Sequence, residues 1–577
     1  MKYQRLLPFL GKYKKYAILS PVTVIGEVMI EIQIPFLMAK IVDIGITNHD
    51  MPYILKMGGI MCILSLIGLL FGTLCAKYAA LASAGLAMGI RQKVFDKVQD
   101  FSFANTDHFS IPSLVTRMTT DITFIQNAFM MIIRTLVRAP IMIISGTIMA
   151  LKIDSELSWV YIISIPILGA IIAVISIKAH PLFQKMLKKY DAMNASVQEN
   201  LVGIRNVKAF VRHEFEDEKF NASAEDVMWS QRQAERIVIW NNPAMMLAVS
   251  SCIMAIVWFG GNRIIFGKMQ IGALFSFITY TRTILNQLMM ISMGMITIVM
   301  SQASVDRILE VLDEKLDITD EGTDPDLKVK DGSIIFDDVS FSYSKNRENE
   351  VLRHIQLDIR SGETIGIIGG TGSAKSSLVQ LIPRLYDTDL GCVRVGGEDV
   401  RKYRLKTLRD AVAIVLQKNV LFSGTIRENL LWGNEQASDA EIEKACRAAQ
   451  AWDFVNSFPD GFETDLGQGG VNVSGGQKQR LCIARALLKK PKIMILDDST
   501  SAVDTATEKM IRDALKKWYS DITVLIIAQR ITSVMGADKI IVLNDGIVNG
   551  VGTHENLLRT NEIYREVYES QQKGMNL

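Results

Sequence analysis

The stretch Thr364-Ile-Gly-Ile-Ile-Gly-Gly-Thr-Gly-Ser-Ala-Lys375-Ser376 decides the fold of the C-terminal half of the chain. A β-like run, residues 364–368, leads into a glycine-rich turn, and the helical pattern SLVQLIPRLY follows. Strand, turn and helix N-terminus form a phosphate cradle, because successive backbone N–H groups point at the same anion. Lys375 adds positive charge there, and Ser376 offers a hydroxyl to Mg²⁺. The sequence therefore predicts a phosphate site, with a chance glycine turn as the alternative.

Two further motifs lie downstream of this turn. The apolar run Ile493-Met-Ile-Leu ends at Asp497 and Asp498, and Asp497 is placed to hold Mg²⁺ through water. Between the motifs, Val473-Ser-Gly-Gly-Gln477 precedes a helical pattern and favours anion binding, although a simple helix cap explains it equally well. Since short β-like runs alternate with helical patterns, we expect an α/β domain with a largely parallel sheet.

The N-terminal half is much more apolar. Apolar residues make up 49% of the whole chain, and runs of about 20 of them, enough to cross a bilayer, occur only before residue 301. Six membrane spans are expected, at residues 17–38, 57–84, 128–151, 157–179, 243–266 and 271–300. The polar, acidic segment 313–331 predicts a linker, which divides the chain into a membrane domain (1–312) and a nucleotide domain (332–577).

The connections between the spans alternate in length. Those after the second and fourth spans are long and helical in pattern, and the second helix could run over residues 57–99, roughly 64 Å. Basic residues gather at the N-terminus and in the second long connection. The positive-inside rule therefore predicts a multi-pass protein of the cytoplasmic membrane with both termini in the cytoplasm.

Charge and cysteine content exclude some classes of protein. The net charge is +2 and the soluble half has no strongly basic stripe, so we expect no nucleic-acid partner. Six scattered cysteines without a C-x-x-C pair do not indicate a disulfide or metal framework.

Taken together, the motifs identify a family. The phosphate loop, Gln417, VSGGQ, the Asp497–Asp498 pair, Ser501-Ala-Val-Asp504 and Ala528-Gln-Arg530 occur in the order and spacing of the ABC transporters. The nucleotide half resembles their ATP-binding domain, and the whole chain resembles the type IV ABC exporters. The expected fold is an α-helical membrane domain of six transmembrane helices with long cytoplasmic extensions, followed by an α/β P-loop ABC nucleotide-binding domain.

The resemblance implies ATP and Mg²⁺ as cofactors, an ATPase-coupled transport activity and a dimer with two ATP molecules between its domains. It implies that Tyr343 stacks on adenine, that Gln417 joins the Mg²⁺ site to the membrane domain, and that VSGGQ grips the γ-phosphate of ATP on the other subunit. It also implies short coupling helices at residues 103–113 and 211–219. The expected nucleotide-binding residues are Tyr343, Gly369, Gly370, Thr371, Gly372, Ser373, Ala374, Lys375, Ser376, Ser377, Gln417, Ser474, Gly475, Gly476 and Gln477, with Ser376, Gln417 and Asp497 at the metal.

The chain departs from the family pattern near the expected hydrolytic water. Asp498 stands where active domains carry glutamate as catalytic base, Gln529 where they carry histidine, and Ala374 where glycine precedes the lysine. A shorter carboxylate is displaced by about 1 Å, which can cost on the order of 100-fold in rate. The sequence therefore resembles the degenerate-site subunit of heterodimeric bacterial multidrug exporters. Its partner would be a second half-transporter with an intact catalytic glutamate and switch histidine; drift in a still-active homodimer is the alternative.

Evidence on the substrate comes from two acids in the first span. Glu27 and Glu31 lie four residues apart, and acids inside a membrane are costly enough to suggest a function. They could attract cationic amphiphiles, or they could instead pair with Arg134 or Arg138 of the third span. We expect export of small amphiphilic compounds, with a lipid or lipid-precursor flippase, homodimeric or not, as the alternative in the same class. A non-transporting nucleotide sensor is the alternative from another class.

Overall fold

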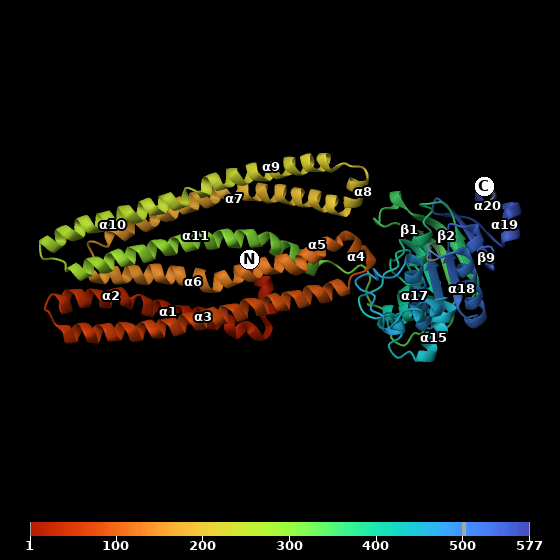
Figure 1. Cartoon of the computed structure of the whole chain (residues 1–577), viewed down its shortest axis with the longest axis horizontal. Helices are drawn as coiled ribbons and strands as arrows, with labels where there is room; N and C mark the ends of the chain where they lie inside the picture. Colours follow the sequence, from red (N-terminus) through yellow and green to blue (C-terminus); the bar gives the residue numbers. More distant parts are fainter. Residues whose placement is uncertain (1, 499–502, 576–577) are drawn as a thin grey trace. The chain divides into compact units, whose positions relative to one another are not determined.

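The structure is a computed structural model that describes residues 2–498 and 503–575. It divides into two compact units (Figure 1). The membrane unit comprises Met1–Gln99 and Ser110–Glu314, and the nucleotide unit comprises Asp100–Phe109 and Lys315–Leu577. Ser501, which we expected to begin a family motif, lies outside the described residues.

The described part of the membrane unit is helical throughout. Its elements are η1 (Lys2–Tyr13), α1 (Lys14–Glu31), α2 (Gln33–Lys40), η2 (Ile41–Ile46), α3 (Met51–Gln99), α5 (Ile111–Thr116), η3 (Arg117–Asp121), α6 (Ile122–Ile153), α7 (Trp159–Val202), α8 (Ile204–Ala209), α9 (His213–Val238), α10 (Asn241–Ile265) and α11 (Ile271–Asp313). Within the described residues, six helical stretches are long and apolar enough to cross a membrane, which confirms the predicted number of spans.

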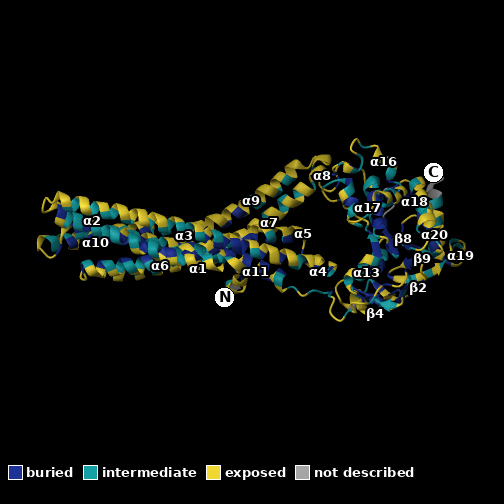
Figure 2. Ribbon diagram, turned by 90° about the horizontal axis from the view of Figure 1, so that it is seen from below, coloured by how far each residue is buried: buried dark blue, intermediate teal, exposed yellow. Residues whose placement is uncertain are grey.

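These helices are longer than a bilayer requires. The 49 residues of α3 give about 74 Å of helix at 1.5 Å per residue, against a hydrocarbon core of about 30 Å. Large apolar side chains such as Leu66 and Ile63 are exposed on its surface, and Figure 2 shows exposed residues along the long helices. In a protein that spans a membrane, such apolar faces contact lipid instead of forming a core.

Buried polar contacts fix how the membrane helices pack against one another. The Tyr161 hydroxyl of α7 donates to the backbone oxygen of Phe277 in α11 at 2.9 Å. Near the other end of α11, the fully buried Asp121 accepts hydrogen bonds from Ser304 and Arg307. Since an unpaired buried carboxylate is very costly, this cluster holds η3 firmly against α11.

The first long connection forms a short helix where we expected one, but the second does not. Helix α4 (Phe103–His108) belongs to the nucleotide unit and occupies the first part of the predicted segment 103–113. In the second connection the expectation of a short helix at 211–219 is wrong: the short helix is α8, and residues 213–219 open the long α9. The break lies at Val211, whose φ of +52° is incompatible with a continuous right-handed helix.

The nucleotide unit is α/β, as predicted. The strands described in residues 315–498 and 503–575 are β1 (Ile334–Phe341), β2 (Leu352–Ile359), β3 (Thr364–Ile368), β4 (Leu390–Val395), β5 (Glu398–Asp399), β6 (Val412–Val415), β7 (Ile493–Asp497), β8 (Thr523–Ile527), β9 (Lys539–Asn544) and β10 (Ile547–Gly552). The helices there are α4, η4 (Arg347–Asn349), α12 (Lys375–Gln380), η5 (Val400–Lys402), α13 (Leu405–Ala411), α14 (Ile426–Leu431), α15 (Asp439–Ala448), α16 (Trp452–Asn456), η6 (Gly461–Glu463), α17 (Gly475–Leu488), α18 (Thr505–Trp518), η7 (Ile531–Ser533), α19 (His554–Thr560) and α20 (Glu562–Met575).

Strand order in the larger sheet brings the motifs together. Among the described residues this sheet runs β10-β9-β3-β8-β7-β6, and its strands are parallel except for the edge strand β10. Strands β3, β8 and β7 are adjacent and almost entirely buried, so the loops after them emerge side by side at one edge of the sheet. A second, antiparallel sheet, β2-β1-β4-β5, was not anticipated, and it positions Tyr343 just after β1.

Candidate nucleotide site

A cavity of about 370 Å³ lies at the carboxyl ends of the three central strands. The loop after β3 contributes Gly369, Gly370, Thr371, Gly372, Lys375 and Ser376 to its wall, the end of β7 contributes Asp497 and Asp498, and the segment after β8 contributes Gln529. Gln417 also lines the cavity, and so does Val567 of α20, which was not predicted. The predicted residues Tyr343, Ser373, Ala374 and Ser377, all within the described part of the chain, are not among the lining residues. The structure therefore gathers most of the expected phosphate, metal and hydrolytic residues around one space.

The phosphate loop folds tightly around its lysine. The Lys375 ammonium donates to the backbone oxygens of Gly369 at 2.9 Å and Gly370 at 2.7 Å, and to the Ser373 hydroxyl at 3.2 Å. Burial lowers the pKa of Lys375, while the nearby carboxylates of Asp498 and Asp497 act in the opposite direction. A phosphate group entering this loop would replace weak carbonyl acceptors with charged oxygens, which bind an ammonium much more strongly.

Ser376 and Asp497 form the candidate metal site. The Ser376 hydroxyl donates to Asp497 at 2.9 Å, and only 3% of Asp497 is exposed. Burial raises the pKa of Asp497, and Asp498 adds to the effect, while the Ser376 hydrogen bond and Lys375 oppose it. A buried carboxylate beside a hydroxyl is a donor set of hard oxygens that fits Mg²⁺, because a divalent cation would offset the cost of burying that charge.

Two of the three positions that depart from the family pattern, Asp498 and Gln529, are hydrogen-bonded to each other. The Gln529 side-chain amide donates to Asp498 at 2.9 Å, and the Gln417 amide donates to the same oxygen at 3.3 Å. Asp498 also has a φ of +45°, in the left-handed region that residues other than glycine rarely adopt. The carboxylate is therefore held from two sides by neutral donors, in a backbone conformation that restricts where it can point.

Ala374 is the third departure, and its backbone explains why glycine is usual there. It has φ of +69° and ψ of +23° directly before α12, again in the left-handed region. For a residue with a Cβ this conformation costs roughly 1 kcal/mol or more. The methyl group of Ala374 therefore strains the phosphate loop even before any contact with a ligand is considered.

Tyr343 lies beside this cavity as part of an aromatic cluster. Its hydroxyl is 2.8 Å from the Ser377 hydroxyl of α12, and its half-exposed ring packs edge-on against Tyr386. Tyr386 in turn donates to Asp107 of α4 at 2.7 Å and packs against Phe103. Sequence reasoning missed Tyr386, since it gives no local signal of a contact with a helix some 280 positions away. Its contacts join α4 to the residue expected to bind adenine.

The VSGGQ motif stands apart from this cavity. Among the described residues, none of the cavity lining comes from Ser474, Gly475, Gly476 or Gln477. Ser474 is exposed and caps α17 through a capping box, in which its hydroxyl accepts from the Gln477 backbone and the Gln477 side chain accepts from the Ser474 backbone. The helix-cap interpretation is thus confirmed. Anion binding stays a prediction, and the exposed helix N-terminus remains available for it.

In the membrane unit, the two acids of the first span share one arginine. Arg138 of α6 contacts Glu27 at 2.6 Å and Glu31 at 2.5 Å, whereas Arg134 is exposed. Gly72 of α3 permits this packing, because a Cβ there would lie 3.3 Å from the Glu27 carboxylate. Of the two arginines considered, Arg138 is the partner, and the three charged groups sum to one negative charge when all are ionised.

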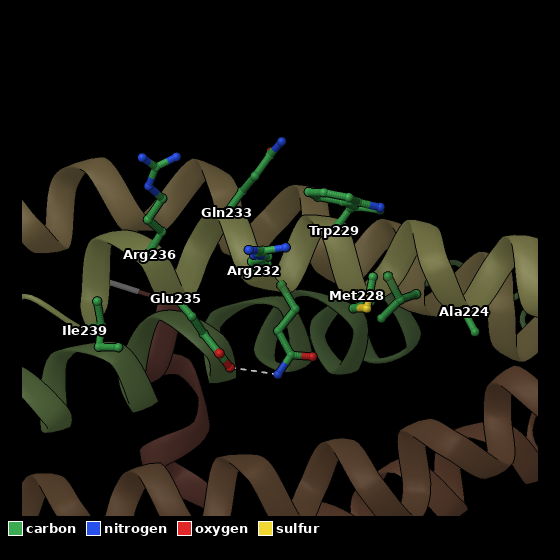
Figure 3. Close-up of a pocket in the computed structure, with 10 residues that line it drawn as sticks. Ala224, Met228, Trp229, Arg232, Gln233, Glu235, Arg236 and Ile239 are labelled. Carbon is green, nitrogen blue, oxygen red and sulfur yellow. Dashed lines mark hydrogen bonds between the residues drawn. The ribbon is translucent and has the colours of Figure 1, made fainter.

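A hollow of about 1120 Å³ runs along α9 in the membrane unit. Figure 3 shows Trp229, Gln233 and Arg236 pointing to one side of the helix, while Glu235 turns away to meet the Gln231 amide at 2.7 Å. The guanidinium of Arg232 lies 5.3 Å from the centre of the Trp229 ring. Since α9 and the adjoining Ile239 supply every lining residue, this hollow is an open helix face and not an enclosed cavity.

Comparison with known proteins places this architecture in a family. Residues 17–289 match the ABC transporter transmembrane region, and residues 352–501 match the ABC transporter family. An uncharacterised ABC transporter ATP-binding protein of Bacillus subtilis, YfiB, is 38% identical over 98% of both chains. A putative multidrug export ATP-binding/permease protein of the same organism, YgaD, is 31% identical over 98% of this chain and 99% of its own.

Two other relatives extend the comparison. An ATP-dependent lipid A-core flippase of Desulfotalea psychrophila is 32% identical over 83% of this chain and 84% of its own. The fold matches that of a bacterial Atm1-family ABC exporter with ATP bound, with a TM-score of 0.85 over 96% of this chain and 99% of the other, at 24% identity. The chain belongs to the ABC transporters and is an ATP-driven exporter whose six-helix membrane region and ATP-binding domain are joined in one polypeptide.

Proposed function

We propose that this chain is one half of a heterodimeric exporter of small amphiphilic compounds, and that its own ATP site holds nucleotide but hydrolyses it very slowly. The observation that carries this proposal is the hydrogen bond from Gln529 to Asp498. It joins the two positions at which hydrolytic members of the family carry glutamate and histidine. A partner chain with both of those residues would supply the competent site.

Nucleotide binding itself is well supported by the residues present. Lys375 and the phosphate loop would bind the β- and γ-phosphates, Ser376 and Asp497 would hold Mg²⁺ with Gln417 beside them, and Tyr343 would stack on adenine. Bound Mg²⁺ would neutralise charge on the phosphates. These groups are residues other than Asp498 and Gln529, although the Gln417 amide donates to Asp498. The proposal therefore assigns binding and hydrolysis to different residues.

Hydrolysis at this site would be slow for two physical reasons. The Asp498 carboxylate is one methylene shorter than glutamate and already accepts hydrogen bonds from Gln529 and Gln417. A general base must lie within hydrogen-bond reach of the water, and an oxygen that already accepts two amide hydrogen bonds has little capacity left to accept the proton of that water. Gln529 can donate to a phosphate, but it cannot become cationic near neutral pH as histidine can.

The test compares the chain alone with the chain in its complex. Purified as a verified homodimer, it should bind ATP and show little ATPase activity. Co-purified with its partner half-transporter, it should show robust ATPase activity that transported compounds stimulate. Robust ATPase activity in the verified homodimer would contradict the heterodimer proposal.

For the substrate, we propose cationic amphiphiles, on the basis of the excess negative charge of Glu27, Glu31 and Arg138. Charged groups within a membrane domain are costly and usually serve transport or structure. Glu27→Gln with Glu31→Gln should reduce transport of cationic compounds more than that of neutral compounds of the same size. An equal loss for both, together with lower thermal stability, would mean that the three charges only hold α1 against α6.

Lipid translocation is a second candidate. It is supported by the 32% identity to a protein named as a lipid A-core flippase. Reconstitution into vesicles distinguishes the two candidates, because an exporter of drugs should show ATPase activity stimulated by added amphiphilic compounds. A flippase should instead respond to the lipid composition of the vesicle. We further propose that both termini lie in the cytoplasm, in line with the basic N-terminus.

A further inference from the structure

The segment that carries Gln529 is short and is positioned by contacts from outside its own strand. It runs from Ala528 to Ser533, directly after β8. Its far end is fixed by Arg512 of α18, which donates to the backbone oxygen of Ser533 at 2.5 Å. The position of the near end decides whether the Gln529 side chain can reach Asp498.

The near end is held by the sheet, through the hydrogen bond from the Ala528 backbone N–H to the Ile367 oxygen at 3.2 Å, and by one side chain of the C-terminal helix α20. The Gln571 amide nitrogen donates to the backbone oxygen of Gln529 at 2.8 Å. The Gln571 amide oxygen accepts from the backbone N–H of Ile531 at 2.9 Å. One amide therefore pairs with the backbone on both sides of Arg530, as a neighbouring β-strand would, and both its donor and its acceptor are used.

Helix α20 presents one face to the domain along its length. Tyr564, Val567 and Gln571 are spaced by three and four residues and so lie on the same side of the helix. Tyr564 is fully buried, its hydroxyl lies 2.8 Å from a ring nitrogen of His554, and its backbone N–H donates to Asn561. This anchor lies two turns from Gln571, so the helix is fixed independently of the nucleotide site.

Val567, between the anchor and Gln571, lines the nucleotide cavity itself. The same helix face thus supplies part of the cavity wall and the Gln571 amide that binds the backbone of the Gln529 segment. We propose that α20 is a positioning element of this ATP site, in which Gln571 sets the place of Gln529 and hence of the Asp498 carboxylate. Gln571 acts through Gln529 and not on the nucleotide directly.

This proposal does not depend on whether the site hydrolyses ATP. If the site only holds ATP, loosening the Gln529 segment should speed the release of nucleotide. If the site hydrolyses ATP, the same change should slow hydrolysis and therefore the release of phosphate. The proposal predicts that position 571 requires an amide side chain. Glutamate there would keep the acceptor for the Ile531 N–H, but it would lose the donor and place a negative charge against the Gln529 carbonyl oxygen.

The test uses the full chain in complex with its partner and three variants. Gln571→Ala removes both hydrogen bonds, and Gln571→Glu removes one of them while keeping the side-chain volume. Gln572→Ala is the matched control, because it changes the same residue type on the same helix, about 100° away around its axis. Hydrogen exchange at the Ile531 amide and the release of nucleotide or phosphate from this chain are measured for each.

With Gln571→Ala we expect exchange at Ile531 to rise about fivefold or more, since a neutral hydrogen bond is lost. We expect nucleotide release, or hydrolysis if the site is active, to change by a similar factor, and Gln571→Glu to be at least as severe. Gln572→Ala should leave all of these unchanged. Unaltered exchange at Ile531 or unaltered nucleotide handling in Gln571→Ala overturns the proposal. Hydrolysis of ATP on this chain would contradict the slow-site proposal alone, since the effect of Gln571 on its rate would remain.

Discussion

The cavity around Lys375 and the exposed N-terminus of α17 at Ser474 are two candidate phosphate-binding sites on one domain, and they differ in how far each keeps the family pattern. Around the cavity, Ala374, Asp498 and Gln529 all depart from it, and Ala374 and Asp498 have strained backbones. At α17, the capping box is complete. In the head-to-tail dimer that we propose, these two sites would serve different ATP molecules. The difference indicates how one chain would combine a weakened site of its own with an intact contribution to the site of its partner.

The largest effect should come from disabling each of the two candidate phosphate-binding sites in turn and comparing the losses of ATP turnover. Ser474→Ala, assayed with an unaltered partner, should lower ATP turnover about 100-fold, because charge stabilisation at the transferred phosphoryl group dominates catalysis. Lys375→Ala should weaken nucleotide binding on this chain and leave more residual turnover. The measurement is steady-state ATPase activity of the complex.

Loss of the helix cap must be separated from loss of the phosphate contact. Ser438→Ala is the matched control, since Ser438 caps α15 with a capping box of the same kind. Each cap is worth about 1 kcal/mol of stability, so the two variants should melt alike. Equal losses of turnover in Lys375→Ala and Ser474→Ala, or a worse loss in Lys375→Ala, would contradict the assignment of slow hydrolysis to the Lys375 site.

A second experiment restores the family residues at the Lys375 site and should reduce the difference in hydrolysis between the two sites. Asp498→Glu with Gln529→His should raise hydrolysis on this chain by at least about tenfold, a part of the roughly 10²–10⁴-fold that a well-placed base contributes. Because the two side chains are hydrogen-bonded, the double change should exceed the product of the single changes. The rate of hydrolysis on this chain is measured as phosphate release from a complex whose partner site is inactivated. Failure of the double variant would point to Ala374 as a further limit.

Much of this comparison could be predicted from the sequence, because each motif follows a strand whose apolar pattern fixes its place. The cavity gathers Lys375, Asp497 and Gln529 because β3, β8 and β7 are neighbours. Local patterns could not choose between Arg134 and Arg138, since both lie on α6 and packing decides.

Contacts between distant parts of the chain were also beyond sequence reasoning. Gln571 lies about 40 residues from the segment that it holds, and one glutamine of a Gln-Gln pair in an amphipathic helix has no distinctive signal. The same is true of Tyr386 and its contact with α4. The place of α8 depends on a left-handed Val211, which no composition rule indicates.

A smaller effect concerns the link between the cavity and α4. Tyr386→Phe keeps the ring against Tyr343 but removes the hydrogen bond to Asp107. Hydrogen exchange in α4 should rise about fivefold or more, since bonds to charged groups are stronger than neutral ones. Tyr403→Phe is the control, because it also loses a tyrosine hydroxyl bond, to Val395, elsewhere in the same domain. Equal exchange in the two variants would show that the Asp107 bond does not hold α4.

The smallest expected effect is at Ala374. Ala374→Gly should stabilise the nucleotide domain by about 1 kcal/mol, because glycine adopts its left-handed backbone without strain. ATP affinity on this chain should rise modestly, with hydrolysis still limited by Asp498. Thermal unfolding and nucleotide titration measure the two quantities. A destabilised variant would show that the methyl group contributes packing that outweighs its strain.

The central claim is that ATP on this chain stays intact while the partner's site turns over. It is tested most directly by labelling the complex during turnover with a photoreactive ATP that carries label on either the α- or the γ-phosphate. After crosslinking and separation of the two chains, this chain should retain both labels equally, whereas the partner should retain mainly the α-label. Loss of the γ-label from this chain at the same rate as from its partner would contradict the account.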